Sequence, residues 1–171
     1  MLRRYGLALL LLLSGCAALE QSESGSFLSM DVKDAIHAAN PLLKKPESYI
    51  SVAHKRGIVL LYGDTSSDEL RQQAEQAARA VPGVEMLHNE ITVNNRAIGI
   101  ASANDALITS RLKGQLMNEE LISPNQIKVV TDRGIVYLLG QVSRQQAEVA
   151  SNAARGIGGV QKVVKVFLYT N

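Results

Sequence analysis

This 171-residue chain has one cysteine and no tryptophan, and its basic and acidic residues nearly balance. The single cysteine, Cys16, excludes an intramolecular disulfide and a metal cage built from cysteines. With no tryptophan and only 4% aromatic residues, the chain has few rings on which bases or sugars could stack. From Cys16 onward 16 basic residues stand against 16 acidic ones, and a neutral chain is a poor general nucleic-acid binder. We therefore expect no nucleic-acid partner.

The usual signs of catalysis and of metal binding are also missing. The three histidines, His37, His54 and His88, have no spacing typical of a metal site, and the second half of the chain has no histidine. The neighbouring carboxylates 68–69 and 119–120 are explained by helix capping and solvation, and the glycines at 156–159 by a helix end. There is no nucleophile motif, so we expect no catalytic residue, no metal and no enzyme activity.

The N-terminus, by contrast, carries a clear signal. Two arginines precede a short apolar run at 6–13, which is far below the roughly 20 residues that span a bilayer. This pattern predicts a secretory signal peptide over residues 1–15. Its end, Leu-Ser-Gly-Cys16, resembles the bacterial lipobox, which implies cleavage before Cys16, a diacylglycerol thioether on its sulfur and acylation of its new amine. The acyl lipid, palmitate among its chains, is the one covalent group that we expect; the alternative is an ordinary secretory signal with a chance cysteine. The absence of Asp after Cys16 favours the outer membrane, facing the periplasm, by comparison with known lipoproteins.

The sequence contains an internal repeat. RGIVLLYG at 56–63 is nearly repeated as RGIVYLLG at 133–140, 77 residues later. The helix-like segments that follow also match, at a distance of 76 residues. Such self-similarity predicts a duplicated domain. We expect a flexible tether at 16–29, which is mostly small and polar, a first domain at 30–94 and a second at 95–171.

Each copy predicts the order αββαβ. The second strand of each copy is continuously apolar, which favours a central position in the sheet, and an Arg-Gly pair before it suits a tight hairpin. The fold class is therefore α+β, with two tandem units that each pack a three-stranded mixed sheet on two helices. We place the helices at 31–43, 67–80, 104–117 and 143–155 (with Asp31 and Asn104 as N-caps of the first helix of each copy), and the strands at 49–54, 58–63, 85–93, 126–131, 135–140 and 161–170.

The spacing Gly-Ile-Val-x-Leu-x-Gly, an Ala-rich helix and then Gly-Val-x-x-Val or Gly-Val-x-x-Leu resembles the BON domain. A lipobox followed by two such domains is similar to the DolP-type outer-membrane lipoproteins. The resemblance implies a non-enzymatic protein that binds anionic phospholipid such as phosphatidylglycerol or cardiolipin. It also implies roles in outer-membrane integrity, osmotic and envelope stress tolerance and cell division. Its implied protein partners are the outer-membrane β-barrel assembly machinery and regulators of cell-wall amidases.

The first helix of the second copy is the candidate lipid site. At about 100° per residue, Ile108 lies on the core stripe, while Leu107 and Arg111 share a neighbouring face with Gly114, flanked by Lys113. An apolar group beside cations suits a phospholipid headgroup layer. The resemblance assigns phospholipid binding to this helix, and we place it at Leu107, Ile108, Arg111, Lys113 and Gly114; the family carries Trp where this chain has Leu107. The alternative is that Leu107 packs against the linker or the first domain.

Charge is divided between the copies. From Cys16 to residue 95 there are 7 basic and 11 acidic residues, whereas from residue 96 onward there are 9 basic and 5 acidic. Anionic lipid should therefore prefer the second domain. The alternatives are a solvated basic face without a partner, or charge attraction that fixes the orientation of the two domains. Three functions remain: a membrane-binding module, a periplasmic interaction scaffold, and a hydrolase, which would need a cleft with converging polar groups.

Overall fold

The structure, a computed structural model, describes residues 24–94 and 103–170. The predicted signal peptide and Cys16 lie outside these residues, as does the segment 95–102 that joins the two copies.

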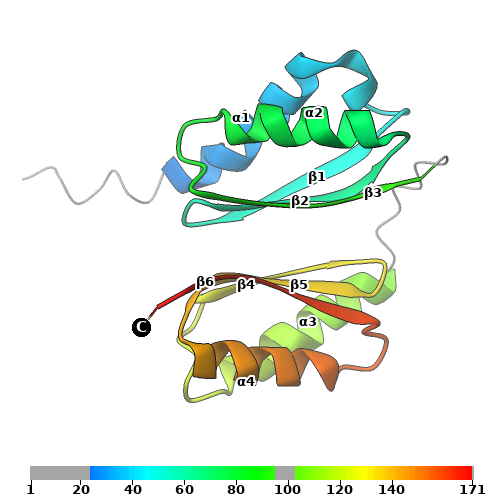
Figure 1. The fold of residues 1–171 in the computed structure, drawn as a ribbon. Helices are drawn as coiled ribbons and strands as arrows, with labels where there is room; N and C mark the ends of the chain where they lie inside the picture. Colours follow the sequence, from blue (N-terminus) through cyan, green and yellow to red (C-terminus); the bar gives the residue numbers. More distant parts are fainter. Residues whose placement is uncertain (1–23, 95–102, 171) are drawn as a thin grey trace, which may run out of the picture.

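Both copies form the order αββαβ, which confirms the predicted fold class. The first domain adds one short 3-10 turn, η1, after its first helix. The elements run in the chain order shown in Figure 1: α1 Ser24–Ala39, η1 Pro41–Leu43, β1 Tyr49–Lys55, β2 Ile58–Thr65, α2 Asp68–Arg79, β3 Met86–Val93, α3 Ala103–Met117, β4 Ile127–Asp132, β5 Ile135–Val142, α4 Arg144–Arg155 and β6 Lys162–Tyr169.

The two sheets have the same topology. In each, the second strand lies in the centre, antiparallel to the first and parallel to the third, giving the orders β1-β2-β3 and β4-β5-β6. The hairpins turn at Arg56-Gly57 and Arg133-Gly134, where all four residues have positive φ, the geometry of a two-residue hairpin turn. The two copies therefore differ little in backbone and mainly in side chains.

Helix α1 begins earlier than the sequence predicts. It starts at Ser24, so residues 24–29, expected in the tether, are helical and Asp31 lies inside the helix, not at its N-cap. Leu28 explains the difference, because it is buried in the first core and lies beside Gly83 in the turn before β3. Burying this side chain stabilises the additional helical turn.

Each sheet uses one face to pack against its own two helices. In the first domain Val59 and Leu61 of β2 face the helices, and in the second domain Val136 and Leu138 of β5 occupy the same positions. Serine N-caps at Ser67 and Ser143 fix the starts of α2 and α4. These two cores are the ones that the repeat predicts.

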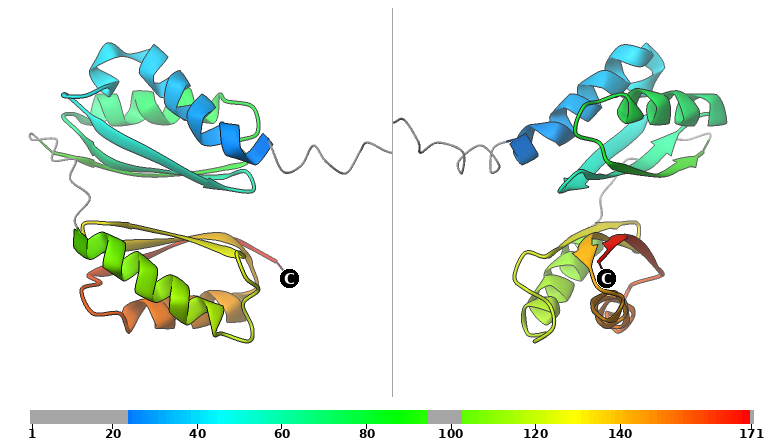
Figure 2. Two further views of the ribbon diagram at one scale, coloured as in Figure 1. Left: turned by 180° about the vertical axis from the view of Figure 1, so that it is seen from behind. Right: turned by 60° about the vertical axis from the view of Figure 1, so that its left-hand side comes forward.

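The other faces of the sheets pack against each other. Leu60, Tyr137, Leu139 and Val166 are at most 2% exposed and belong to one apolar cluster that contains residues of both domains. Figures 1 and 2 show the resulting stack of four layers, in which α1 and α2 cover one outer side and α3 and α4 cover the opposite one. The continuous apolar runs of β2 and β5 are explained by burial on both faces of each strand.

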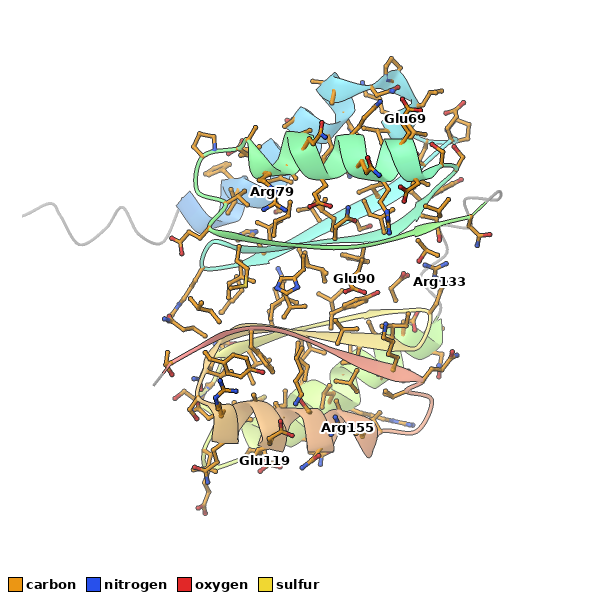
Figure 3. The ribbon with its side chains drawn as sticks, in the orientation of Figure 1. Glu69, Arg79, Glu90, Glu119, Arg133 and Arg155 are labelled. Atoms are coloured by element: carbon orange, nitrogen blue, oxygen red, sulfur yellow. The ribbon has the colours of Figure 1, made fainter. Side chains whose placement is uncertain are left out.

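An ion pair closes one end of this interface. Arg133 Nη1 lies 2.8 Å from Oδ1 of Asp64, a carboxylate whose side chain is only 2% exposed, and Nη2 lies 3.3 Å from Asp132. Figure 3 shows Arg133 between the two sheets. The backbone N–H groups of Arg133 and Gly134 donate to the buried carboxylate of Asp105, at 2.9 and 2.8 Å, which ties this turn to the start of α3. The orientation of the domains is therefore fixed by apolar packing together with a paired charge.

Candidate functional site

The outer side of α3 carries the residues predicted to contact lipid. Leu107 is 54% exposed, and Arg111, Lys113 and Gly114 are exposed as well. A Cβ added to Gly114 would meet no atom within 4 Å, so this part of the helix surface is open. Helix α3 covers the side of the second sheet that faces away from the first domain (Figure 2).

Ile108 is the exception among the predicted contacts. It is 1% exposed and packs in the second core with Leu112 and Leu116, at the helical spacing of a core stripe. Its side chain cannot reach a bilayer while the domain is folded. Ile108 therefore positions the helix, and the site on the outer face consists of the other residues.

Sequence reasoning missed Met117 and Leu121, which extend the apolar part of this surface. Met117, the last residue of α3, is 73% exposed, and Leu121, just beyond the helix, is 47% exposed. Met117 lies ten residues after Leu107, which places it about 80° around the helix from Leu107 at 100° per residue and still away from the core stripe. That spacing is a signal which could have identified it. The outer face of α3 thus carries apolar side chains near both ends.

The electrostatics of α3 favour an anion. The one acidic residue of this helix, Asp105, is buried against the β4–β5 turn, so the exposed charges of α3 are Arg111 and Lys113, one on each flank of the outer face. Within the part of the chain that the structure describes, no carboxylate forms an ion pair with either cation. Both remain available to phosphate oxygens.

Helix α1 gives the matched comparison. Leu28, Val32 and Ile36 form its core stripe, as Ile108, Leu112 and Leu116 do in α3, and Leu28 lies beside Gly83 as Ile108 lies beside Gly159. In this alignment Phe27, also 54% exposed, is the equivalent of Leu107. Asp31 is the equivalent of Arg111, and Asp34 is the equivalent of Gly114; both acids are exposed. The two copies therefore present one exposed apolar side chain at the same place, beside acids in the first copy and beside cations in the second.

Within 24–94 and 103–170 no group of three or more His, Cys, Asp or Glu side chains could hold a metal ion. None of the described helices combines the length and apolarity that crossing a bilayer requires.

The comparison with known proteins matches the BON domain family twice, at residues 28–95 and 104–171. The chain is 32% identical over 125 residues to the "Outer membrane lipoprotein DolP" of Haemophilus influenzae, covering 73% of this chain and 65% of the relative. It is 34% identical over 126 residues to the "21 kDa hemolysin" of Actinobacillus pleuropneumoniae, covering 73% and 64%. It is 30% identical over 117 residues to "Osmotically-inducible protein Y" of Escherichia coli, covering 67% and 58%.

The matches therefore span about three fifths of the length of these relatives. Because the family matches cover most of this chain and coincide with its two repeated units, the chain belongs to the BON domain family, as a protein with two BON domains that is similar to DolP.

Proposed function

We propose that this protein is a non-enzymatic outer-membrane lipoprotein, anchored through Cys16 and facing the periplasm, whose second BON domain binds anionic phospholipid. Phosphatidylglycerol and cardiolipin are the expected lipids. Its role is to support outer-membrane integrity and tolerance of envelope stress, including at division sites. The names of two relatives, an outer membrane lipoprotein and an osmotically inducible protein, support the envelope setting.

One observation carries the lipid proposal: exposed Leu107 lies beside exposed Arg111 and Lys113 on a helix with no exposed acid. The apolar side chain enters the boundary of the acyl chains while the cations meet phosphates. A well-placed cation near an anionic surface contributes about 1 kcal/mol. The acyl anchor keeps the helix near lipid at high effective concentration, so a weak site is sufficient.

The test is co-sedimentation of residues 17–171, without the anchor, with phosphatidylglycerol vesicles and with neutral phosphatidylcholine vesicles. Arg111→Glu changes the charge by two units, so we expect about thirtyfold weaker binding to the anionic vesicles. Leu107→Glu should weaken binding by at least tenfold, because it replaces apolar contact with a repelled charge. The matched control is Phe27→Glu, which makes the same change at an equally exposed position of α1 and should leave binding unchanged.

Two results would contradict the proposal. The first is absence of binding by the unaltered protein to anionic vesicles. The second is equal loss in Leu107→Glu and Phe27→Glu, which would mean that binding is not specific to α3.

The second candidate function is a periplasmic scaffold for the β-barrel assembly machinery or for regulators of cell-wall amidases. The apolar side chains Phe27 and Met30, 54% and 57% exposed beside Asp31 and Asp34, favour it, since they suit a protein surface with basic and apolar residues. A detergent-sensitivity assay in a deletion strain separates the two functions. Complementation that fails with Leu107→Glu supports the lipid module, and complementation that fails only with Phe27→Glu supports the scaffold.

A further inference from the structure

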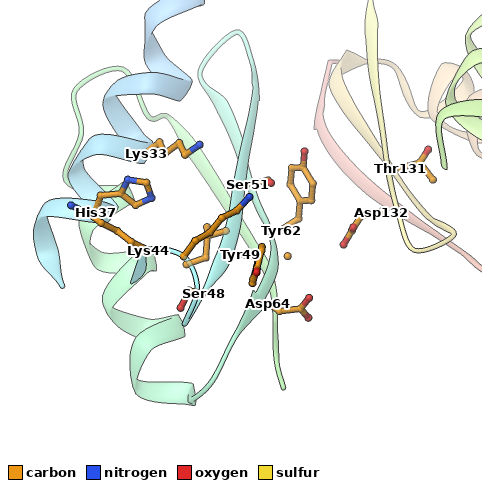
Figure 4. A pocket seen from close by; sticks show the side chains of 13 residues that line it. Lys33, His37, Lys44, Ser48, Tyr49, Ser51, Tyr62, Asp64, Thr131 and Asp132 are labelled. Carbon is orange, nitrogen blue, oxygen red and sulfur yellow. The ribbon is translucent and has the colours of Figure 1, made fainter. Parts of the chain in front are cut away.

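A hollow of about 580 Å³ is lined by the C-terminal half of α1, the segment that follows η1, strands β1 and β2, and the end of β4 in the other domain. Figure 4 shows its lining. This volume is within the range of small-molecule sites, which are roughly 300 to 1,000 Å³. The hollow lies apart from the outer face of α3, and its lining shares Tyr62 with the interdomain apolar cluster.

One wall of this hollow is basic. Lys33 and His37 come from α1, while Lys44 and Lys45 follow η1. Among the described residues none of the three lysines forms an ion pair. Partial burial lowers the pKa of His37, and the nearby Lys33 and Lys44 lower it further, against the opposite effect of Asp34. Three ammonium groups are thus gathered on one wall without a carboxylate partner, an arrangement that favours an anion.

The opposite wall is polar, and one guanidinium group offsets part of the charge of its two carboxylates. It includes the Tyr62 ring together with Asp64 and Asp132, and both carboxylates are already paired with Arg133. Oxygens of these groups can accept hydrogen bonds from hydroxyl groups of a ligand. The hollow therefore suits a molecule with an anionic group at one end and hydroxyl groups at the other.

The corresponding hollow of the second domain is smaller and more apolar. The hollow at the corresponding position, between the end of α3 and the start of β4, is only about 140 Å³ and is lined by Leu116, Met117, Ile122 and Ile127 among others. By the alignment of core stripes Lys113 corresponds to Lys33, and Met117 corresponds to His37. The segment after the helix supplies Ser123 and Pro124 there, instead of Lys44 and Lys45 in the first domain. A surface that merely needed solubility would not need a larger, cation-lined hollow in the otherwise more acidic copy.

We propose that this hollow of the first domain binds the phosphate ester of a small polyol, with the phosphate on the lysines and the hydroxyl groups toward Tyr62, Asp64 and Asp132. Glycerol phosphate is the simplest such group, whether it comes as a soluble molecule or as the headgroup of phosphatidylglycerol. Lys45 already lies over the Tyr49 ring, with Nζ 5.0 Å from its centroid, so one ammonium group is oriented at the rim. This site is separate from α3, and the inference does not depend on the lipid proposal.

The test is a ¹H–¹⁵N NMR titration of residues 17–171 with sn-glycerol 3-phosphate, and with glycerol as the uncharged control. We expect shifts at the backbone amides of Lys44, Lys45 and Tyr49 with the phosphate ester and none with glycerol. The double variant Lys44→Gln/Lys45→Gln should bind at least tenfold more weakly. The matched control Lys162→Gln, an exposed lysine of the second domain, should bind as the parent does.

Two further arms separate this site from the lipid face and identify the source of the ligand. Arg111→Glu must retain the titration with soluble glycerol phosphate even if it loses vesicle binding. In the unaltered protein, phosphatidylglycerol vesicles that compete with glycerol phosphate identify a headgroup as the ligand, while an unchanged titration identifies a soluble ester. The proposal is overturned if no shifts appear, if Lys44→Gln/Lys45→Gln titrates like the parent, or if the shifts map to α3.

Discussion

The ion pair between Arg133 and Asp64 gives the most direct test of the domain arrangement, through the substitution Arg133→Met. The Asp64 side chain is 2% exposed and the Arg133 side chain 34% exposed. Removing one partner of a fully buried ion pair costs about 3–5 kcal/mol, because the other charge is left without compensation. Since a third of Arg133 reaches solvent, which screens the pair, we expect Arg133→Met to lower the free energy of unfolding by about 2 kcal/mol.

The first copy supplies the control for this experiment. Arg56 occupies the same position of the first hairpin turn, with φ of 47° against 50° for Arg133, but it is exposed and has no ion pair with a described residue. Arg56→Met therefore reproduces the change of side chain in the turn without the loss of the ion pairs to Asp64 and Asp132, and we expect a change within about 0.5 kcal/mol. The assay is urea unfolding followed by circular dichroism. The cycle with Asp64→Asn should give a coupling of at least about 1 kcal/mol. Equal effects of Arg133→Met and Arg56→Met would refute the reasoning.

The remaining predictions concern the interface and the glycines. Burial raises the pKa of Tyr137 to about 12, so the folded protein keeps this proton when the unfolded chain, with a pKa near 10, has lost it. This contribution to stability is complete below pH 10 and is lost as the pH rises from 10 toward 12, so between pH 9 and 11 the parent should lose about 1 kcal/mol more than Tyr137→Phe in urea unfolding. The exposed control Tyr169→Phe should follow the parent, and a parallel loss in Tyr137→Phe would contradict the assignment. Gly140→Ala should cost about 1–3 kcal/mol, since its Cβ would lie 2.6 Å from the carbonyl oxygen of Gln126, whereas Gly114→Ala on the open face of α3 should stabilise by up to about 1 kcal/mol. Thermal unfolding of both variants checks the opposite signs.

The internal repeat made most of the fold predictable. The two hairpins, the central strands and the order of the elements follow from hydrophobic patterns that are present in each copy separately. The last glycine of each repeated motif has a local cause, because Gly63 and Gly140 face a carbonyl group of the neighbouring strand that leaves no room for a Cβ. Such constraints act within one copy and are visible in a single sequence.

Other features depend on contacts between segments that the sequence does not connect. The early start of α1 depends on Leu28 reaching the turn at Gly83, and the pairing of Arg133 with Asp64 depends on how two sheets meet. On α3 the helical period separated Leu107 and Arg111 from Ile108, but placing Ile108 among the lipid contacts was wrong because the core takes its side chain. The cationic hollow is lined by three segments of one domain and a strand of the other, so it cannot be predicted from a local sequence pattern.

The face-to-face packing of the sheets makes this chain resemble a homodimer whose two subunits have been fused. The apolar positions between the sheets are equivalent in the two copies: Ala53, Ile58, Leu60 and Tyr62 of one correspond to Val130, Ile135, Tyr137 and Leu139 of the other. Tyr62 packs against Tyr137, with ring centroids 6.0 Å apart, so two non-equivalent positions of the copies meet, as happens in a two-fold dimer. Covalent linkage turns this association into an intramolecular step that no longer depends on concentration. It also frees each outer helix layer from the requirement of symmetry, so that one copy could become acidic and keep a polar hollow while the other became basic and apolar.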